Sequence, residues 1–314
     1  MSLIVYDPHT KRFEKEQVAG EGILKVLYGT APGTLLLNGL IKRKAVQLFA
    51  GAYCDSPFSV SRIKPFIEDY GIPMAEAVIP PGGFRTFNEF FTRALRPGAR
   101  PLPAKGCHLV SPADARVRVA TDLAIDAALQ AKGHPYHLAE LLGDASLAEP
   151  FEGGTLFTLR LNPTDYHRFH YPISCMDLGS AHFPGAYYSV NPLALQRIPE
   201  LYLKNKRVVT YLRHPSLGPI ALVQVGATSV GSIHHRRGAG PARIGEEKGY
   251  FAFGGSTLLV LTPPSPGWAI REDLLLLSAK GLEVRLRQGE SLMEDLLARS
   301  PLDEETTDQA SKKA

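Results

Sequence analysis

The segment from Phe251 to Val260 reads Phe-Ala-Phe-Gly-Gly-Ser-Thr-Leu-Leu-Val, so that two glycines precede Ser256 and an apolar run follows it. Glycine adopts backbone angles that other residues resist, which lets Ser256 sit in a strained turn with its hydroxyl available as a nucleophile. The alternative is a tight β-turn that uses the hydroxyl only as a cap. The pattern is not Gly-x-Ser-x-Gly and no helix is expected after it, which disfavours the nucleophile elbow of an α/β-hydrolase.

A second segment, Leu161-Asn-Pro-Thr-Asp-Tyr-His-Arg-Phe-His170, carries His167 and His170 three residues apart, just beyond an expected strand. Two histidines at this spacing could bind a metal ion, although they do not form the H-E-x-x-H pattern of a zinc helix. Imidazole also exchanges protons near neutral pH, so that one histidine is a candidate base and the other a candidate acid. The third interpretation is a pair of polar loop histidines, and this segment alone does not decide between the three.

Asp114 lies in the turn Ser-Pro-Ala-Asp, directly before an expected strand. An aspartate in such a turn commonly accepts a hydrogen bond from its own backbone, so this residue alone is weak evidence for catalysis. A basic loop, His-His-Arg-Arg at residues 234–237, is expected to be structural or solvated.

Composition excludes several classes of protein. The 314 residues fit two domains of roughly 150 residues, and 44% hydrophobic and 21% charged residues are typical of a globular chain. A net charge of +4 is too small to indicate nucleic-acid binding. Cys54, Cys107 and Cys175 form no C-x-x-C pair, which fits a reducing cytoplasm better than a disulfide framework or a zinc ribbon. We see no signal peptide and no apolar stretch long enough to span a bilayer.

The elements expected around these residues indicate an α+β protein. Residues 1–105 are expected to be mainly helical, with a helix over 59–70 ending at Gly71 and another from a capping box at Thr86 to about Leu95. An irregular connector over 96–106 separates them from a β-rich core at 106–299, where residues 155–161 alternate as a strand and residues 282–287 alternate as a half-buried strand. Short strands joined by glycine-rich turns predict a mostly antiparallel β-sandwich or flattened barrel. The polar tail 300–314 is expected to be disordered.

Residues 22–53 concentrate positive charge. They contain Lys25, Lys42, Arg43 and Lys44 and no acidic residue. From Thr34 onward the apolar residues favour one face of a helix, which Lys44 interrupts. The segment is therefore either an interfacial element on anionic lipid or a core-packing helix with a solvated basic side.

Motifs that are weak one by one occur in a fixed order along the chain. They are FFTRALRPGARPL, VSPADARV, LNPTDYHRFHYP, YYSVNP, VQVGATSVGSI, EEKGYFAFGGST and the region 285–289. Together they resemble the phosphatidylserine decarboxylase family of pyruvoyl-dependent proenzymes, over roughly residues 6–292. The Gly-Gly-Ser-Thr context is similar to that of one bacterial subgroup.

The resemblance implies that the precursor cleaves itself between Gly255 and Ser256, giving chains 1–255 and 256–314. Ser256 attacks the carbonyl of Gly255, His170 is the base that takes its proton, and Asp114 orients His170. Elimination and hydrolysis then turn residue 256 into a covalent pyruvoyl group.

The same resemblance implies the reaction that follows. The pyruvoyl group forms a Schiff base with the amine of phosphatidylserine and accepts electrons as carbon dioxide leaves, which yields phosphatidylethanolamine. His167 is implied as the proton donor or as a contact to the phosphate. Neither a metal nor a diffusible cofactor is expected.

A lipid substrate changes the interpretation of the basic segment. We expect residues 22–53 to rest on an anionic membrane surface and the protein to be peripheral on the cytoplasmic face of the cell membrane. The two cleaved chains are expected to stay together as a heterodimer, and a higher homo-oligomer is compatible with this arrangement.

One departure from the family pattern is Ala115, which replaces the glycine that usually follows the aspartate of Ser-Pro-Ala-Asp. If this position needs a positive φ, alanine strains the turn and shifts Asp114. Two other functions remain open: a pyruvoyl decarboxylase of a soluble amino acid, and a lipid-binding protein that is never cleaved.

Overall fold

A computed structural model of the chain describes residues 4–16, 21–36, 39, 44–124, 137–227, 233–254 and 256–298. Gly255, Lys42, Arg43 and the tail expected to be disordered lie outside these residues. The predicted α+β class is confirmed: helices and large, mostly antiparallel sheets together make up the fold.

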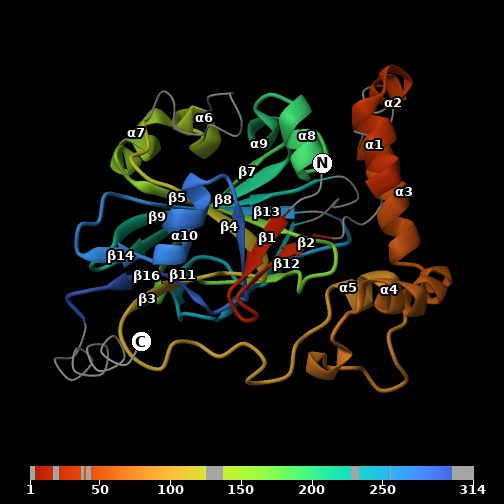
Figure 1. The fold of residues 1–314 in the computed structure, drawn as a ribbon, viewed down its shortest axis with the longest axis horizontal. Helices are drawn as coiled ribbons and strands as arrows, with labels where there is room; N and C mark the ends of the chain where they lie inside the picture. Colours follow the sequence, from red (N-terminus) through yellow and green to blue (C-terminus); the bar gives the residue numbers. More distant parts are fainter. Residues whose placement is uncertain are drawn as a thin grey trace.

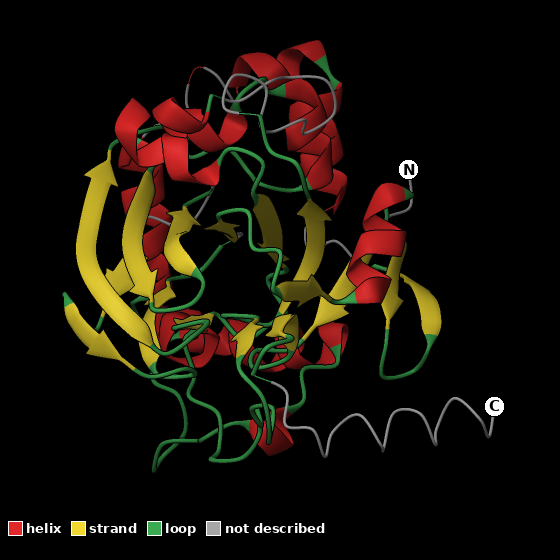
Figure 2. Cartoon of the chain, turned by 90° about the vertical axis from the view of Figure 1, so that its left-hand side faces the viewer, coloured by secondary structure: helices red, strands yellow, loops and turns green. Residues whose placement is uncertain are grey.

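Ten strands form the main sheet in the order β11-β7-β8-β9-β13-β5-β4-β15-β1-β2. The only parallel pair between its described strands is β1 with β15. In Figure 2 the strands curve around the interior of the core, which agrees with the expected sandwich or flattened barrel. The strands are β1 (Ile4–Asp7), β2 (Arg12–Lys15), β4 (Ala115–Ala120), β5 (Thr155–Leu161), β7 (Cys175–Phe183), β8 (Arg207–His214), β9 (Gly218–Val225), β11 (Gly240–Ala242), β13 (Ser256–Thr262) and β15 (Glu283–Leu286).

Two smaller sheets, β10-β12-β6 and β14-β16-β3, complete the core. Their strands are β3 (His108–Val110), β6 (Arg168–His170), β10 (Ile233–His235), β12 (Glu247–Phe251), β14 (Trp268–Ile270) and β16 (Ser291–Asp295). Strand β6 and the turn after β3 bring the histidine and aspartate motifs into this part of the molecule.

Strand β13 lies between β5 and β9, and all seven of its residues are buried. Successive side chains of a strand point to opposite faces, and the two faces of β13 enter separate cores. Leu258 and Val260 belong to one apolar cluster, and Leu259 and Leu261 belong to the other. This explains why the sequence after Ser256 is continuously apolar instead of alternating.

The helices lie around the sheets. Helices α6 to α9 cover one face of the main sheet, and α1 to α3 stand beside the core (Figure 1). A third apolar cluster joins the end of α3 to α4 and α5. The helical elements are α1 (Glu21–Gly29), α2 (Ala31–Leu36), α3 (Lys44–Cys54), α4 (Ile63–Tyr70), α5 (Phe87–Phe91), α6 (Leu138–Leu142), α7 (Ala145–Ala148), α8 (Pro192–Arg197), α9 (Leu201–Lys204), α10 (Glu272–Ala279), and the 3-10 turns η2 (Pro57–Arg62), η3 (Met74–Glu76) and η4 (Glu149–Phe151).

Two helix boundaries differ from the sequence prediction. The helix expected over 59–70 is the 3-10 turn η2 followed by α4, and it ends as predicted, at Gly71 with φ 61°. The helix expected from Thr86 to Leu95 ends at Phe91, because the chain beyond it pairs with a distant segment: the N–H of Val78 donates to the carbonyl of Ala94 at 2.9 Å. The hairpin β1–β2 within the expected helical region was not predicted.

No helix among the described residues has the length and apolar character needed to cross a bilayer.

Candidate active site

The residues before Ser256 are held by α5. The Thr86 hydroxyl caps this helix by accepting from the N–H of Glu89 at 3.1 Å, as the capping box predicted. The Asn88 side-chain carbonyl accepts a hydrogen bond from the N–H of Phe253 at 2.8 Å. The Phe253 ring packs edge-on against Phe87 and Phe91, with centroid distances of 4.9 and 5.1 Å. Both the backbone and the side chain three residues before Ser256 are therefore fixed.

Ser256 begins β13 and is completely buried. It pairs with Leu161 of β5, so that the strand holds it in register with the histidine segment that follows β5. Gly254 has a φ of 140°, a region that favours glycine. Gly255, the expected cleavage partner, lies outside the described residues.

His167 is the histidine that lies beside Ser256. Its Nε2 is 3.0 Å from the carbonyl of Asn162 and its Nδ1 is 3.5 Å from Ser256 Oγ. A carbonyl only accepts, so Nε2 carries the proton and Nδ1 offers a lone pair to the serine. Burial lowers the pKa of His167 to about 3, which keeps the ring neutral at neutral pH. Phe91 stacks on the ring at a centroid distance of 4.0 Å.

His170 lies on β6, opposite Glu247 of β12, and its N–H donates to the carbonyl of Pro112. Its Nδ1 is buried and has no hydrogen-bond partner among the described residues. Burial lowers the pKa of His170, while the charges of Glu247 and Asp114 oppose that shift. The structure therefore places Asp114 within electrostatic range of His170, but it records no hydrogen bond between His170 and either Asp114 or Ser256 in the part of the chain that it describes.

The Asp114 carboxylate is held by other groups. Arg100 donates to it twice, at 2.8 and 2.6 Å, and the N–H of Gln288 donates at 2.8 Å. Gln288 belongs to the 285–289 region, so this contact joins two of the motifs. At Gly289, which has a φ of 90°, an added Cβ would come within 2.8 Å of the Pro101 carbonyl, and only glycine fits there.

Ala115 does not strain the turn. It is a buried first residue of β4, and it is not among the described non-glycine residues with positive φ. The conformation that would have required glycine is absent at this position, and Asp114 keeps its contacts.

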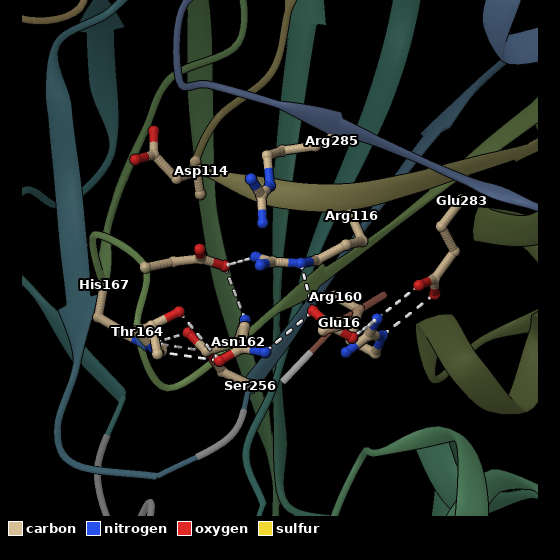
Figure 3. Close-up of polar contacts among 12 residues, drawn as sticks. Glu16, Asp114, Arg116, Arg160, Asn162, Thr164, His167, Ser256, Glu283 and Arg285 are labelled. Carbon is tan, nitrogen blue, oxygen red and sulfur yellow. Dashed lines mark hydrogen bonds and ion pairs between the residues drawn. The ribbon is translucent and has the colours of Figure 1, made fainter. Parts of the chain in front are cut away.

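Asn162, whose carbonyl contacts His167, also contacts a network of buried charges (Figure 3). Glu16 forms ion pairs with Arg116 and Arg160, and Arg160 also pairs with Glu283 at 2.5 Å. Asn162 donates from its side chain to Glu16 at 2.9 Å. The residue that fixes the tautomer of His167 is thus anchored by a charged cluster that reaches the N-terminal hairpin.

Asp165 extends the network towards Asp114. It pairs with Arg116 and accepts the N–H of Asn162 at 2.7 Å. Burial raises the pKa of Asp165 despite its arginine partner. In Figure 3 Asp114 lies on one side of Arg116, and Asn162, Thr164 and Ser256 lie on the other.

The three interpretations of the histidines can now be compared with the structure. Both ring nitrogens of His167 face protein groups, and within the described residues no three histidine, cysteine or acidic side chains gather as a metal site would need. The basic loop at 234–237 is partly structural: His235 contacts Gln224 at 3.0 Å, and the carbonyl of Arg237 accepts from the buried Lys248.

Several residues of the site were not singled out from the sequence. They are Asn88, Phe91, Arg93, Arg100, Asn162 and the charged network around Glu16. One signal was present: Arg116 and Arg160 interrupt otherwise apolar strands, and a charged residue on a buried strand needs a partner.

Comparison with known proteins shows the family to which the chain is related. The sequence profile described as phosphatidylserine decarboxylase matches residues 87–294. A protein of Ruminiclostridium cellulolyticum named phosphatidylserine decarboxylase proenzyme is 41% identical over 290 residues, which cover 92% of this chain and 96% of that protein. Proteins of the same name from Clostridium perfringens and Clostridium kluyveri are each 39% identical, over 92% and 91% of this chain and 98% and 97% of theirs.

Proposed function

The chain belongs to the phosphatidylserine decarboxylase family, and we propose that it converts phosphatidylserine to phosphatidylethanolamine through a pyruvoyl group made from its own Ser256. The observation that carries this proposal is the position of Ser256: a buried serine that follows two glycines, opens the central strand and faces the lone pair of His167. Its relatives are named proenzymes, which agrees with a chain that is made as a precursor.

The proposed cleavage uses groups of the chain and one water molecule. Ser256 Oγ attacks the carbonyl carbon of Gly255 and the peptide nitrogen leaves, so that an ester replaces the amide. Elimination then breaks the Cβ–O bond of residue 256, which releases the carboxylate of Gly255 and leaves dehydroalanine. Water replaces the amine, ammonia is released, and a keto group remains.

The surroundings of Ser256 fit such a group. The site is buried, residue 256 pairs with Leu161 of β5 while the next residue, Thr257, pairs with both β5 and β9, and His167 lies next to it. Once formed, the group supplies a ketone conjugated to an amide, which draws electrons from the bond to the departing carboxyl carbon.

We assign the two histidines to different steps. His170, with an unpartnered buried Nδ1 near Asp114, is the proposed base for cleavage. His167 is the proposed proton carrier for decarboxylation. Its neutral Nδ1 can take a proton from the incoming ammonium group and return one to the carbon that loses carbon dioxide.

The two chains produced by cleavage would remain bound to each other. Chain 256–314 contributes β13, β14, α10, β15 and β16, and β13 pairs with β5 and β9 over most of its length. Separating them would expose a strand whose side chains enter two apolar cores, so we propose a stable heterodimer.

Helices α1 to α3 support approach to a membrane. Leu35 is 76% exposed, Phe49 is 79% exposed and, just beyond α3, Phe58 is 83% exposed. Exposed large apolar side chains on consecutive elements are candidates for an interaction surface. We propose that this surface binds anionic lipid at the cytoplasmic face of the membrane, with the basic residues of segment 22–53 nearby.

Intact mass spectrometry of the purified protein tests the proposal. We expect two chains divided before residue 256, with no free amino group at the start of the smaller one. The Ser256→Ala variant should remain a single chain of about 34.2 kDa. A wild-type chain that stays whole after prolonged incubation would contradict the proposal. Vesicles of phosphatidylserine and free serine, supplied separately, then identify the substrate, since decarboxylation of free serine alone would indicate a soluble-substrate enzyme.

A further inference from the structure

We propose that Arg93, in a cavity that Asp165 and Tyr166 line just before His167 in the chain, binds the phosphate group of the lipid head group. The cavity has a volume of about 260 Å³ and lies between the end of α4, strands β4 and β15, and the loop 164–166 that leads to His167. Arg93 and Asp114 both line it. This inference rests on the proposed function and adds to it a residue that recognises the substrate.

Arg93 is the unusual cation of this cavity. It is only 6% exposed, yet it forms no ion pair with any residue that the structure describes. Its Nε has no hydrogen-bond partner, and its one hydrogen bond, from Nη1 to the carbonyl of Phe90, is long at 3.4 Å. The guanidinium also lies over the Phe90 ring, 5.1 Å from its centroid. A buried charge without a directly paired counterion is costly, so this arrangement favours an anionic ligand.

The neighbouring arginines do not share this property. Arg100 is paired with Asp114 and Glu76. Arg116 is paired with Glu16 and Asp165. Two more arginines line the cavity: Arg285 pairs with Asp7 and Glu14, and Arg287 is exposed. Since the acids of the cavity are committed to other arginines, Arg93 is the buried cation left for a ligand.

The position of Arg93 relates it to the reacting group. Phe91, two residues before Arg93, stacks on the His167 ring at a centroid distance of 4.0 Å, and His167 Nδ1 is 3.5 Å from Ser256 Oγ. The charge of Arg93 also acts on His167. A bound anion at Arg93 would therefore lie near the histidine that we assign to decarboxylation. The charges of Asp114 and Asp165 also act on Arg93, which places it at the meeting point of the cavity and the site.

The chemistry of the reaction favours the phosphate over the carboxylate of the substrate as the group that Arg93 binds. The carboxylate loses its charge as carbon dioxide leaves, so a cation bound to it would stabilise the ground state more than the transition state. The phosphate keeps its charge throughout the reaction. The planar guanidinium of arginine also suits two oxygen atoms of a phosphate at once.

Binding can be measured on the Ser256→Ala chain, which keeps the precursor intact. We would titrate it with inorganic phosphate, glycerophosphoserine and free serine in a calorimeter, and repeat the titrations in Arg93→Gln, Arg93→Lys and Arg213→Gln backgrounds. Arg213 is exposed on β8 and provides the same change of charge away from the cavity. Thermal melting of each variant checks that it is folded.

We expect phosphate and glycerophosphoserine to bind and serine not to bind. Arg93→Gln should weaken binding by about tenfold or more, Arg93→Lys by less, and Arg213→Gln not at all. In the processed enzyme, Arg93→Gln should raise KM for phosphatidylserine vesicles more than it lowers kcat. Equal phosphate affinity with and without Arg93, or binding of phosphate that glycerophosphoserine does not displace, would overturn the inference. A wild-type enzyme that fails to decarboxylate phosphatidylserine would instead refute the proposed function, which separates the two failures.

Discussion

Replacing His167 by alanine separates the two reactions assigned to this site. In the intact chain Nδ1 is 3.5 Å from Ser256 Oγ, which is longer than the roughly 2.5–3.0 Å of a hydroxyl hydrogen bond. The contact therefore activates the serine weakly, and we expect His167→Ala to cleave itself within about tenfold of the parent rate. Decarboxylation should suffer more, because loss of a general acid or base typically costs about 10²–10⁴ in rate, or roughly 3–5 kcal/mol of barrier.

The low pKa of His167 shapes how it carries a proton. With a pKa of about 3, only about one ring in 10⁴ is protonated at pH 7. The ring therefore holds no proton of its own to donate from Nδ1, but it can accept one. The substrate's ammonium group supplies that proton, and His167 then passes it on. Its tautomer is fixed by Asn162, so the accepting nitrogen always faces residue 256.

The assay measures both steps on the same sample. Cleavage is followed by gel and intact mass, and turnover on phosphatidylserine vesicles is normalised to titrated pyruvoyl groups. His234→Ala, an exposed histidine on β10, is the matched control. We expect His170→Ala and Asp114→Asn to remain largely uncut, with a double variant little worse than either. A His167→Ala chain that stays uncut while His170→Ala cuts normally would reverse the two roles and refute this reasoning.

Three further predictions follow from contacts around the site. In the uncleaved Ser256→Ala chain, His167 should lower the free energy of unfolding by about 2 kcal/mol between pH 7 and pH 5. The reason is that the unfolded ring, with its ordinary pKa of 6.5, binds a proton over this range and the buried ring does not. Urea unfolding of a His167→Gln variant should show a shallower dependence on pH. Asn88→Ala should slow cleavage by about tenfold, since the N–H of Phe253 loses its acceptor, and an unchanged time course on gels would contradict this role. Glu16→Gln should lower the free energy of unfolding by about 3–5 kcal/mol, because two buried arginines lose a shared partner, as measured by urea titration.

The parts of the fold that were predictable depend on local signals. The strand after Ser256, the cap at Thr86 and the helix end at Gly71 are each specified by a few neighbouring residues, and all three are present. The hairpin β1–β2 was missed because its strands have four residues each, too few for a period to be recognised. Helix α5 ends early because pairing with the segment after η3 outweighs the local preference for helix.

The candidate site, like the fold, was predictable only where local signals specify it. The residue types and their motifs identified Ser256, His167, His170 and Asp114, but which side chains touch depends on contacts between distant segments. Arg100 lies 14 residues before Asp114 and occupies both of its carboxylate oxygens, a pairing that no spacing indicated. Likewise, a sequence cannot tell which of two histidines on one short segment turns towards a strand that starts 89 residues after His167; the geometry places His167 there.

Helix α5 connects the cleavage segment to the surface that we expect at the membrane. The Asn88 side chain donates to Asp55 at 2.7 Å, directly after α3, and accepts from the N–H of Phe253 at 2.8 Å. One amide therefore joins the end of the helix that carries the exposed Phe49 to the backbone three residues before Ser256. Phe91, one turn further along α5, stacks on His167. These contacts link the helix that carries Phe49, the segment before Ser256 and His167 to a single short helix. We therefore expect a lipid held by that helix surface to present its head group on the side of the core where His167 meets residue 256.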